Sequence, residues 1–135
     1  DIMSLAKGIA DGVPMGAVVA KKEIADVFKP GDHGSTFGGS CLAIAACAAT
    51  LSALVRGDYA DHAAKVGAYM EAKLAKLPHV TEVRGRGLML GCDLDDAAGA
   101  VINATGAHTL RFLPPLVCEE ADVDSLIEIL AGVLG

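Results

Sequence analysis

A run of small apolar residues between Cys41 and Arg56 restricts the fold more than any other part of the sequence. It is rich in alanine and apolar around nearly every turn, with Thr50 and Ser52 as its interior polar residues. Such a run predicts a helix that is buried and closely packed by its neighbours. It is shorter than the roughly eighteen apolar residues that a membrane-spanning helix requires, so we do not expect a membrane span.

The remaining hydrophobic pattern predicts short strands and helices in an α/β chain. The strands are expected at residues 2–6, 17–20, 80–84, 88–94, 101–103 and 109–113. Besides the apolar run, helices are expected at 21–28, at 58–77 with Asp58 as N-cap, and at 119–134. In the second of these, Ala63, Val66, Met70, Leu74 and Leu77 form an apolar stripe. A bend is expected around residues 85–87, with Arg84 and Arg86 flanking Gly85 as solvated arginines. Residues 79–135 are expected to form a separate α+β lobe.

Charge and composition exclude several functions. The net charge is −6, no cluster of Lys and Arg is present, and aromatic residues make up only 4%. Nucleic acids and anionic membranes are therefore disfavoured as partners. The four histidines and four cysteines show no zinc-type spacing, so no metal site is expected. We interpret the cysteines as free buried thiols of a cytosolic protein: Cys41, Cys47, Cys92 and Cys118.

Lys7 follows an apolar strand and directly precedes Gly8. A lysine in that position is usually a solvated strand end. The alternative is an amine that reaches a pocket at the sheet edge and forms a Schiff base there. From position alone, the solvated strand end is the favoured interpretation of Lys7.

Two further groups of residues could bind anions. The loop at 34–39 carries the Ser35 and Thr36 hydroxyls and several glycine N–H groups just before a helix, which suits a phosphate, although such loops are common. Arg111 alternates with apolar residues in a strand and could form a two-pronged contact with a carboxylate, or could simply face solvent. Neither a P-loop nor a G-x-G-x-x-G dinucleotide motif is present.

Read in order, three segments resemble the class III aminotransferases, which depend on pyridoxal phosphate. Residues 4–17 read SLAKGIADGVPMGA, residues 33–39 read HGSTFGG, and residues 110–116 read LRFLPPL. The resemblance implies the C-terminal portion of a PLP-dependent transferase of fold type I. Residues 1–57 are then a remnant of the large cofactor-binding domain, 58–78 a linking helix and 79–135 the small C-terminal α+β domain.

The resemblance also implies roles for individual residues. Lys7 holds pyridoxal 5'-phosphate as a Schiff base and moves a proton at the substrate. Thr36 binds the cofactor phosphate, Ser35 lies near the substrate and Arg111 pairs with a substrate carboxylate. In the family, the loop carrying Ser35 and Thr36 reaches the active site of a second subunit, so a homodimer is expected. Within the family, the resemblance of residues 30–36 implies the substrate. The implied reaction is transfer of the amino group of N-acetylornithine to 2-oxoglutarate, a step of arginine biosynthesis in the cytoplasm.

Other interpretations stay open. The amino donor could be another ω-amino compound. The family's upstream half supplies the other cofactor contacts, and the chain, which starts at Asp1, is expected to be a piece of something longer. A non-catalytic C-terminal fragment is therefore the main alternative. Residues 95–100 replace a helix of the family, which predicts either a shortened lobe or omitted residues.

Overall fold

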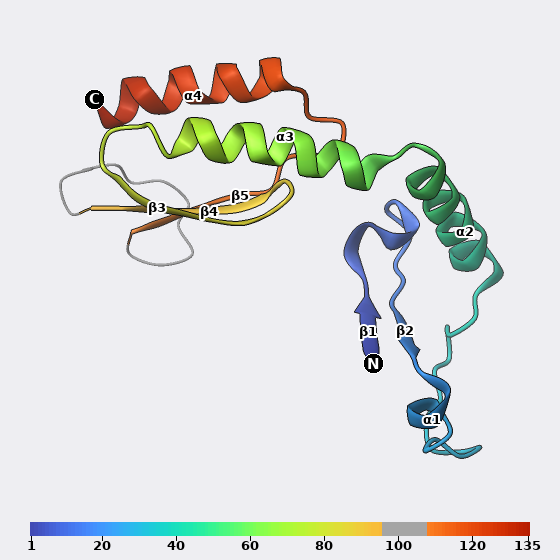
Figure 1. Ribbon diagram of the computed structural model, residues 1–135. Coiled ribbons are helices and arrows are strands. Elements are labelled where there is room, and N and C mark those ends of the chain that lie inside the picture. Colours follow the sequence, from blue (N-terminus) through green and yellow to red (C-terminus); the bar gives the residue numbers. More distant parts are fainter. Residues whose placement is uncertain (96–107) are drawn as a thin grey trace. The chain divides into compact units, whose positions relative to one another are not determined.

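The computed structural model describes residues 1–95 and 108–135, which form two compact units, 1–57 and 58–135 (Figure 1). The predicted strand at 101–103 and nearly all of the connection at 95–100 lie outside the described residues. The mixture of helices and antiparallel strands agrees with an α/β chain. None of the described helices is by itself long and apolar enough to cross a membrane. The helices α2 (Cys41–Arg56) and α3 (Tyr59–Leu74) pass that test of length and composition only as a bent pair.

The first unit is built on one pair of antiparallel strands. β1 (Ile2–Leu5) pairs with β2 (Ala17–Ala20), and both lie where they were predicted. Between them the chain forms a 3-10 turn, η1 (Lys7–Ala10). A short helix, α1 (Lys22–Ala25), follows, and then a loop leads to α2 (Cys41–Arg56). The unit therefore has a small core, in which Ile9 and Ala10 of η1 pack against Cys47 of α2.

The helix α2 has the predicted bounds but is not buried as predicted. Only Ala43 and Cys47 of its side chains are buried, whereas Leu42 is 71% exposed and Val55 79%. The reason is that the small core of this unit, built mainly on η1, covers only one side of α2. The prediction of four buried thiols fails for the same reason at Cys41, which is exposed, while the other three cysteines are free and buried.

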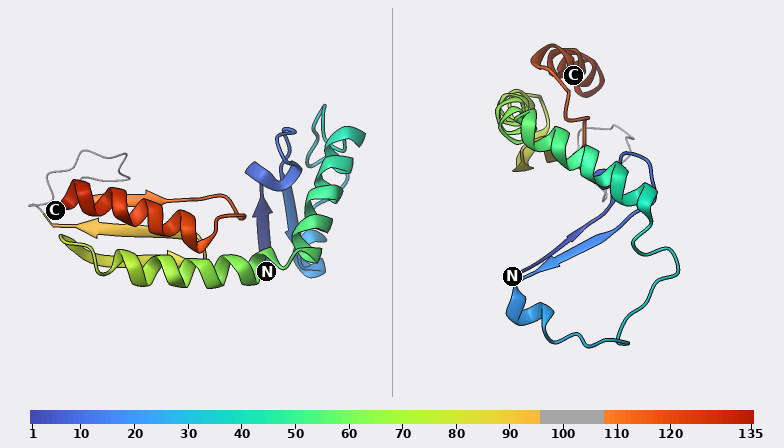
Figure 2. Two further views of the ribbon diagram at one scale, coloured as in Figure 1. Left: turned by 90° about the horizontal axis from the view of Figure 1, so that it is seen from above. Right: turned by 90° about the vertical axis from the view of Figure 1, so that its right-hand side faces the viewer.

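The second unit is a sheet covered by two helices. The strands β3 (Val80–Arg86), β4 (Met89–Leu94) and β5 (Thr109–Phe112) pair antiparallel in that order. The helices α3 (Tyr59–Leu74) and α4 (Glu120–Leu134) lie side by side on one face of the sheet (Figures 1 and 2). The core between the two layers holds Val66, Met70, Leu74, Leu90, Cys92, Leu110, Val123, Leu130 and Leu134.

The helix ends differ from the prediction in their details. Asp58 stands at the N-cap of α3, as expected, but its backbone is left-handed (φ 49°) and its side chain makes no capping hydrogen bond. The start of α4 is capped instead, because the backbone N–H of Glu119 donates to the carboxylate of Asp122 over 2.9 Å. The predicted bend at 85–87 is shorter than expected, since β3 continues through Arg86.

Candidate active site

Lys7 occupies a strained position at the end of β1. It is the first residue of η1 and has a φ of 58°, in the left-handed region that a lysine rarely adopts. This conformation costs roughly 1–2 kcal/mol for a residue with a β-carbon. Backbone strain of this kind persists only where the surroundings enforce it, and it concentrates at functional sites.

The surroundings of Lys7 are fixed by hydrogen bonds and packing. The N–H of Ile9 donates to the carbonyl of Ala6 over 3.3 Å, and the N–H of Asp11 donates to the carbonyl of Gly8 over 3.2 Å. Ile9 is 7% exposed and Ala10 is fully buried, whereas the Lys7 side chain is exposed. The turn is thus anchored on its apolar side and presents the lysine amine outward.

The loop before α2 offers hydroxyls and backbone N–H groups. Its turn is closed by hydrogen bonds from the N–H of Gly38 to the carbonyl of Ser35 and from the N–H of Ser40 to the carbonyl of Phe37, both at 3.3 Å. A β-carbon on Gly38 would lie 3.0 Å from that of Ser35, so the turn favours glycine there. Ser40, the N-cap residue, makes no side-chain cap, so the first N–H groups of α2 remain available to an anion. Ser35 and Thr36 lie in the loop that precedes this helix, and both are exposed.

The predicted residues are divided between the two units. Within the described residues, no hydrogen bond or ion pair joins the Lys7 amine to Ser35 or Thr36. These three residues belong to the first unit and Arg111 to the second. The described residues also contain no cluster of His, Cys, Asp or Glu that could hold a metal ion.

Arg111 lies on the outer face of β5. It pairs with Gly91 of β4, and its side chain is exposed while that of Leu110 is buried. Within the part of the chain that the structure describes, its guanidinium has no ion-pair partner. Arg84 differs, because it forms an ion pair with Asp93 on the neighbouring strand. Arg84 is exposed, as predicted, but it lies in the strand β3 and not in a bend, and it is paired with a carboxylate. An exposed guanidinium without such a partner can bind an external carboxylate.

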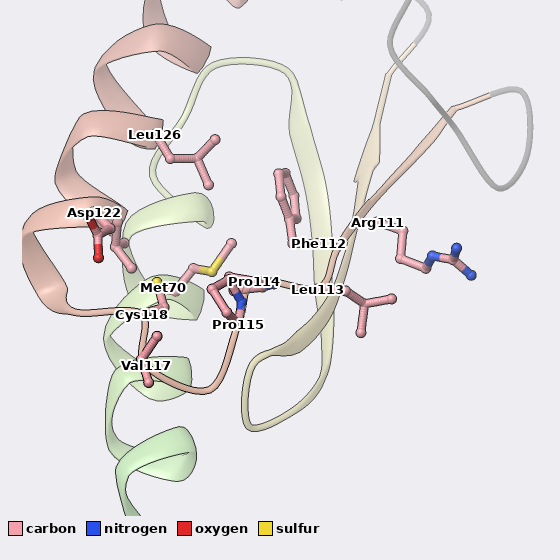
Figure 3. A pocket seen from close by; sticks show the side chains of 11 residues that line it. Met70, Arg111, Phe112, Leu113, Pro114, Pro115, Val117, Cys118, Asp122 and Leu126 are labelled. Carbon is pink, nitrogen blue, oxygen red and sulfur yellow. The ribbon is translucent and has the colours of Figure 1, made fainter. Parts of the chain in front are cut away.

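A cavity of about 520 Å³ lies beside Arg111 in the second unit. Figure 3 shows Met70, Phe112 and Leu126 on the helix side of β5, with the Arg111 guanidinium directed to the other side. The chain that follows β5 completes the lining with Leu113, Pro114, Pro115, Val117 and Cys118. The cavity is therefore lined mainly by apolar side chains; Asp122 at the start of α4 also lines it, and Arg111 borders it with its guanidinium directed away.

One contact beside this cavity was not predicted from the sequence. His62 of α3 lies 2.9 Å through Nε2 from the carbonyl oxygen of Cys118. From the sequence, His62 is one of four histidines without zinc-type spacing. The two residues are 56 positions apart, so no local spacing could have revealed the contact.

Comparison with known proteins places the chain among aminotransferases. The profile of the family described as Aminotransferase class-III matches residues 1–134. The acetylornithine aminotransferase of Caldanaerobacter subterraneus subsp. tengcongensis is 44% identical over 149 aligned positions, which cover 99% of this chain and 38% of that protein. The acetylornithine aminotransferase of Bacillus subtilis is 38% identical over 136 positions, covering 91% of this chain and 35% of that protein.

Solved structures give the same result. The acetylornithine aminotransferase of Elizabethkingia anophelis matches with a TM-score of 0.84 and 30% identity, covering 99% of this chain and 40% of that one. An ornithine aminotransferase of Toxoplasma gondii, described with partial occupancy of PLP at its active site, matches with a TM-score of 0.84 and 33% identity, covering 99% and 36%. The chain thus spans less than half the length of these relatives. Its fold is a fragment of fold type I PLP-dependent transferases, as predicted.

Proposed function

The chain belongs to the class III aminotransferases, which are enzymes, and on this premise we propose that it is the C-terminal part of one that transfers the amino group of N-acetylornithine to 2-oxoglutarate. The match of the family profile over residues 1–134 carries this proposal. The names of the relatives support acetylornithine as donor. This reaction serves arginine biosynthesis, and we place it in the cytoplasm.

The residues of the first unit suit pyridoxal 5'-phosphate. Lys7 presents an amine from a hydrogen-bonded turn, and Ser35 and Thr36 present hydroxyls in the loop that leads to the uncapped N–H groups of α2. This set matches an aldehyde at one end of the group and a phosphate at the other. When bound, the group supplies an aldehyde that captures amines and a ring that delocalises charge from the substrate α-carbon.

Each residue then has a distinct task. Lys7 holds the cofactor covalently and, once its amine is free, moves a proton at the substrate α-carbon. Thr36 binds the phosphate, and Ser35 lies beside it toward the substrate. Arg111 orients the substrate through its carboxylate. An amine outside a well-packed turn could not keep the alignment that proton transfer needs, which explains the anchoring of η1.

We propose that the enzyme is a homodimer in which the loop at 33–39 serves the partner's site. Two observations support this. Ser35 and Thr36 are exposed, and neither hydroxyl contacts the Lys7 amine of its own chain within the described residues. A loop that completes the site of a second copy has both properties.

A second donor is favoured by one observation. The solved structures that match include ornithine aminotransferases with TM-scores as high as that of the acetylornithine enzyme. Ornithine, or another ω-amino compound, is therefore the alternative donor. A non-catalytic fragment is the other alternative, because the chain spans 38% of the first relatives' length.

The test uses the full-length protein with pyridoxal phosphate. Glutamate formation from 2-oxoglutarate is measured with N-acetylornithine and with ornithine as donors, and we expect the former to give the higher kcat/KM. Lys7→Ala should remove the visible absorbance of the lysine-bound cofactor and nearly all turnover. Lys22→Ala is the matched control, since Lys22 only pairs with Asp26 on the surface. Normal turnover by Lys7→Ala would contradict the assignment.

A further inference from the structure

We propose that His62 is a positioning residue that fixes residues 113–118 beside Arg111 and thereby sets the affinity of the site for a dicarboxylate. The inference rests on the proposed function only in taking Arg111 as the group that binds a carboxylate. His62 itself touches neither substrate nor cofactor in this role. It acts through the backbone of Cys118.

The sheet stops supporting the chain just after Arg111. The last pairs between β4 and β5 are Gly91 with Arg111 and Leu90 with Phe112. Beyond Phe112 the chain leaves the sheet, and the next two residues after Leu113 are Pro114 and Pro115, which have no N–H to donate. The path of this segment must therefore be fixed at its far end.

The far end is fixed at Cys118. Its side chain is 7% exposed and belongs to the core of the second unit. Its N–H donates to the carbonyl of Pro115 over 2.9 Å, which closes a turn. Its own carbonyl oxygen lies 2.9 Å from Nε2 of His62. Burial, a turn and a hydrogen bond thus converge on one residue.

The hydrogen bond from His62 ties the segment to α3. A carbonyl oxygen only accepts, so Nε2 carries the proton and donates it. The ring is partly buried, with 28% of the side chain exposed, and the nearest carboxylate oxygen, of Glu119, is 4.0 Å from the same nitrogen. Among the described residues, no other side chain hydrogen-bonds to the backbone of residues 113–118. Without His62, the Cys118 carbonyl would lose its partner at a partly buried place.

The segment matters to a ligand because it shares a cavity with Arg111. Leu113, Pro114, Pro115 and Val117 line that cavity, and Figure 3 shows the Leu113 side chain on the same side of the strand as the Arg111 guanidinium. A dicarboxylate held by the Arg111 guanidinium therefore meets Leu113, the first residue of this segment, whose position depends on the rest of the segment. A segment that shifts or fluctuates weakens the ligand's contacts, because ordering the segment is then added to the free energy of binding.

The experiment measures binding of glutarate, an unreactive dicarboxylate, to the full-length protein by calorimetry. His62→Leu removes the donor, and we expect the Kd for glutarate to rise about five- to tenfold, the size of one lost hydrogen bond. His62→Gln keeps an N–H donor at similar reach and should restore most of the affinity. Lys65→Leu, an exposed residue on the same helix, controls for an added apolar side chain and should bind as the unmodified protein does.

Any of three results would overturn the inference. The first is an unchanged Kd for glutarate in His62→Leu, and the second is an equal loss of affinity in His62→Leu and His62→Gln. The third is that the unmodified protein does not bind glutarate. Should His62→Leu not fold, the ¹⁵N shifts of the His62 ring in the unmodified protein decide: a proton on Nε2 supports the inference and a proton on Nδ1 alone contradicts it. Glutarate binding needs no turnover. If glutarate binds with an affinity that depends on His62 but the protein transfers no amino group, only the proposed function is contradicted.

Discussion

Gly67 of α3 passes so close to Gly87, in the turn between β3 and β4, that a β-carbon on Gly67 would lie 2.2 Å from the Gly87 carbonyl oxygen. Gly87 itself has a φ of 55°, which a residue with a β-carbon adopts only with strain. The two glycines therefore let the helix approach the sheet at backbone distance. That approach allows Val66 and Met70 to reach the core under the sheet.

Gly67→Ala should destabilise the second unit by about 2 kcal/mol or more, because the added methyl group can only be accommodated by moving α3 or the turn. Alanine favours a helix by about 1 kcal/mol over glycine, so the steric effect has to exceed that gain. Chemical denaturation measures the change in the free energy of unfolding.

Gly132→Ala in α4 is the matched control. Nothing lies within 4 Å of a β-carbon at Gly132, so the same substitution should stabilise the protein by about 0.5–1 kcal/mol. If both variants changed stability in the same direction, the close contact of α3 with the turn would not be the cause.

Acid should weaken the sheet of the second unit through Asp93. The hydrogen bond from Arg84 is the main cause that lowers the pKa of Asp93 below its usual range, and the hydrogen bond from Thr109 is the second. A carboxyl group with a lowered pKa in the folded state stabilises the fold above its unfolded pKa of about 3.9, and this contribution is lost as the pH falls through the folded value. Asp93→Asn should therefore lower stability at pH 7 and reduce the further loss between pH 4 and pH 2.

The comparison for Asp93 is Asp124→Asn. Hydrogen bonds from Lys73 and Tyr69 also lower the pKa of Asp124, between α4 and α3, so it contributes to stability in the same pH window. Each single variant should keep part of the acid dependence, and the double variant should keep the least. An Asp93→Asn variant with the acid dependence of the unmodified protein would contradict the role of the Arg84 pair.

Much of the fold could be predicted because it depends on local patterns. The apolar stripe containing Val66, Met70 and Leu74 gave the buried face of α3, and the run from Cys41 to Arg56 gave the bounds of α2. The predictions that failed concern burial and local backbone conformation, which depend on contacts with other elements. The burial of α2 requires elements that the described residues do not supply, and the missing side-chain cap at Asp58 follows from a backbone conformation that no pattern reveals.

The candidate site was predictable only through resemblance. Composition and spacing favoured a solvated strand end for Lys7. Nothing local distinguished Arg111 from Arg84, which the structure shows in an ion pair. His62 could not be found from the sequence because its partner, Cys118, comes from a distant turn. Long-range contacts of this kind are set by the packing of α3 on the sheet, which the local pattern does not specify.

Arg111→Lys should lower kcat/KM of the full-length enzyme for 2-oxoglutarate about tenfold or more. A lysine keeps the charge but loses the planar, two-pronged contact with a carboxylate. Arg86→Lys is the control, since Arg86 is an exposed strand arginine without an ion pair among the described residues, and it should be close to neutral. An unchanged kcat/KM in Arg111→Lys would make Arg111 a surface charge.

The isolated chain of residues 1–135 should self-associate through α2. Ile44, Leu51 and Val55 are 51%, 42% and 79% exposed and share one face of the helix by their spacing of seven and four. An exposed apolar face of this kind favours association. Sedimentation at rising concentration should show larger species, and Val55→Glu should reduce them while Lys65→Glu does not. A monomer at all concentrations would contradict the prediction.

The isolated chain should also have no aminotransferase activity, because it holds only part of a site. Its candidate cofactor contacts are the Lys7 amine, the two hydroxyls of the loop and the first N–H groups of α2. In the proposed function these groups would bind a phosphate and an aldehyde, but none of them would orient a ring or stabilise charge on it. Positioning contributes roughly 7–11 kcal/mol in well-oriented reactions, and most of this would be absent.

The amine can still react with free pyridoxal phosphate, as any accessible lysine can, so cofactor absorbance alone does not count as activity. The assay is glutamate formation by the purified chain with saturating cofactor, N-acetylornithine and 2-oxoglutarate. A rate above about 1 per second per chain, typical of an enzyme, would show that these residues assemble a working site by themselves.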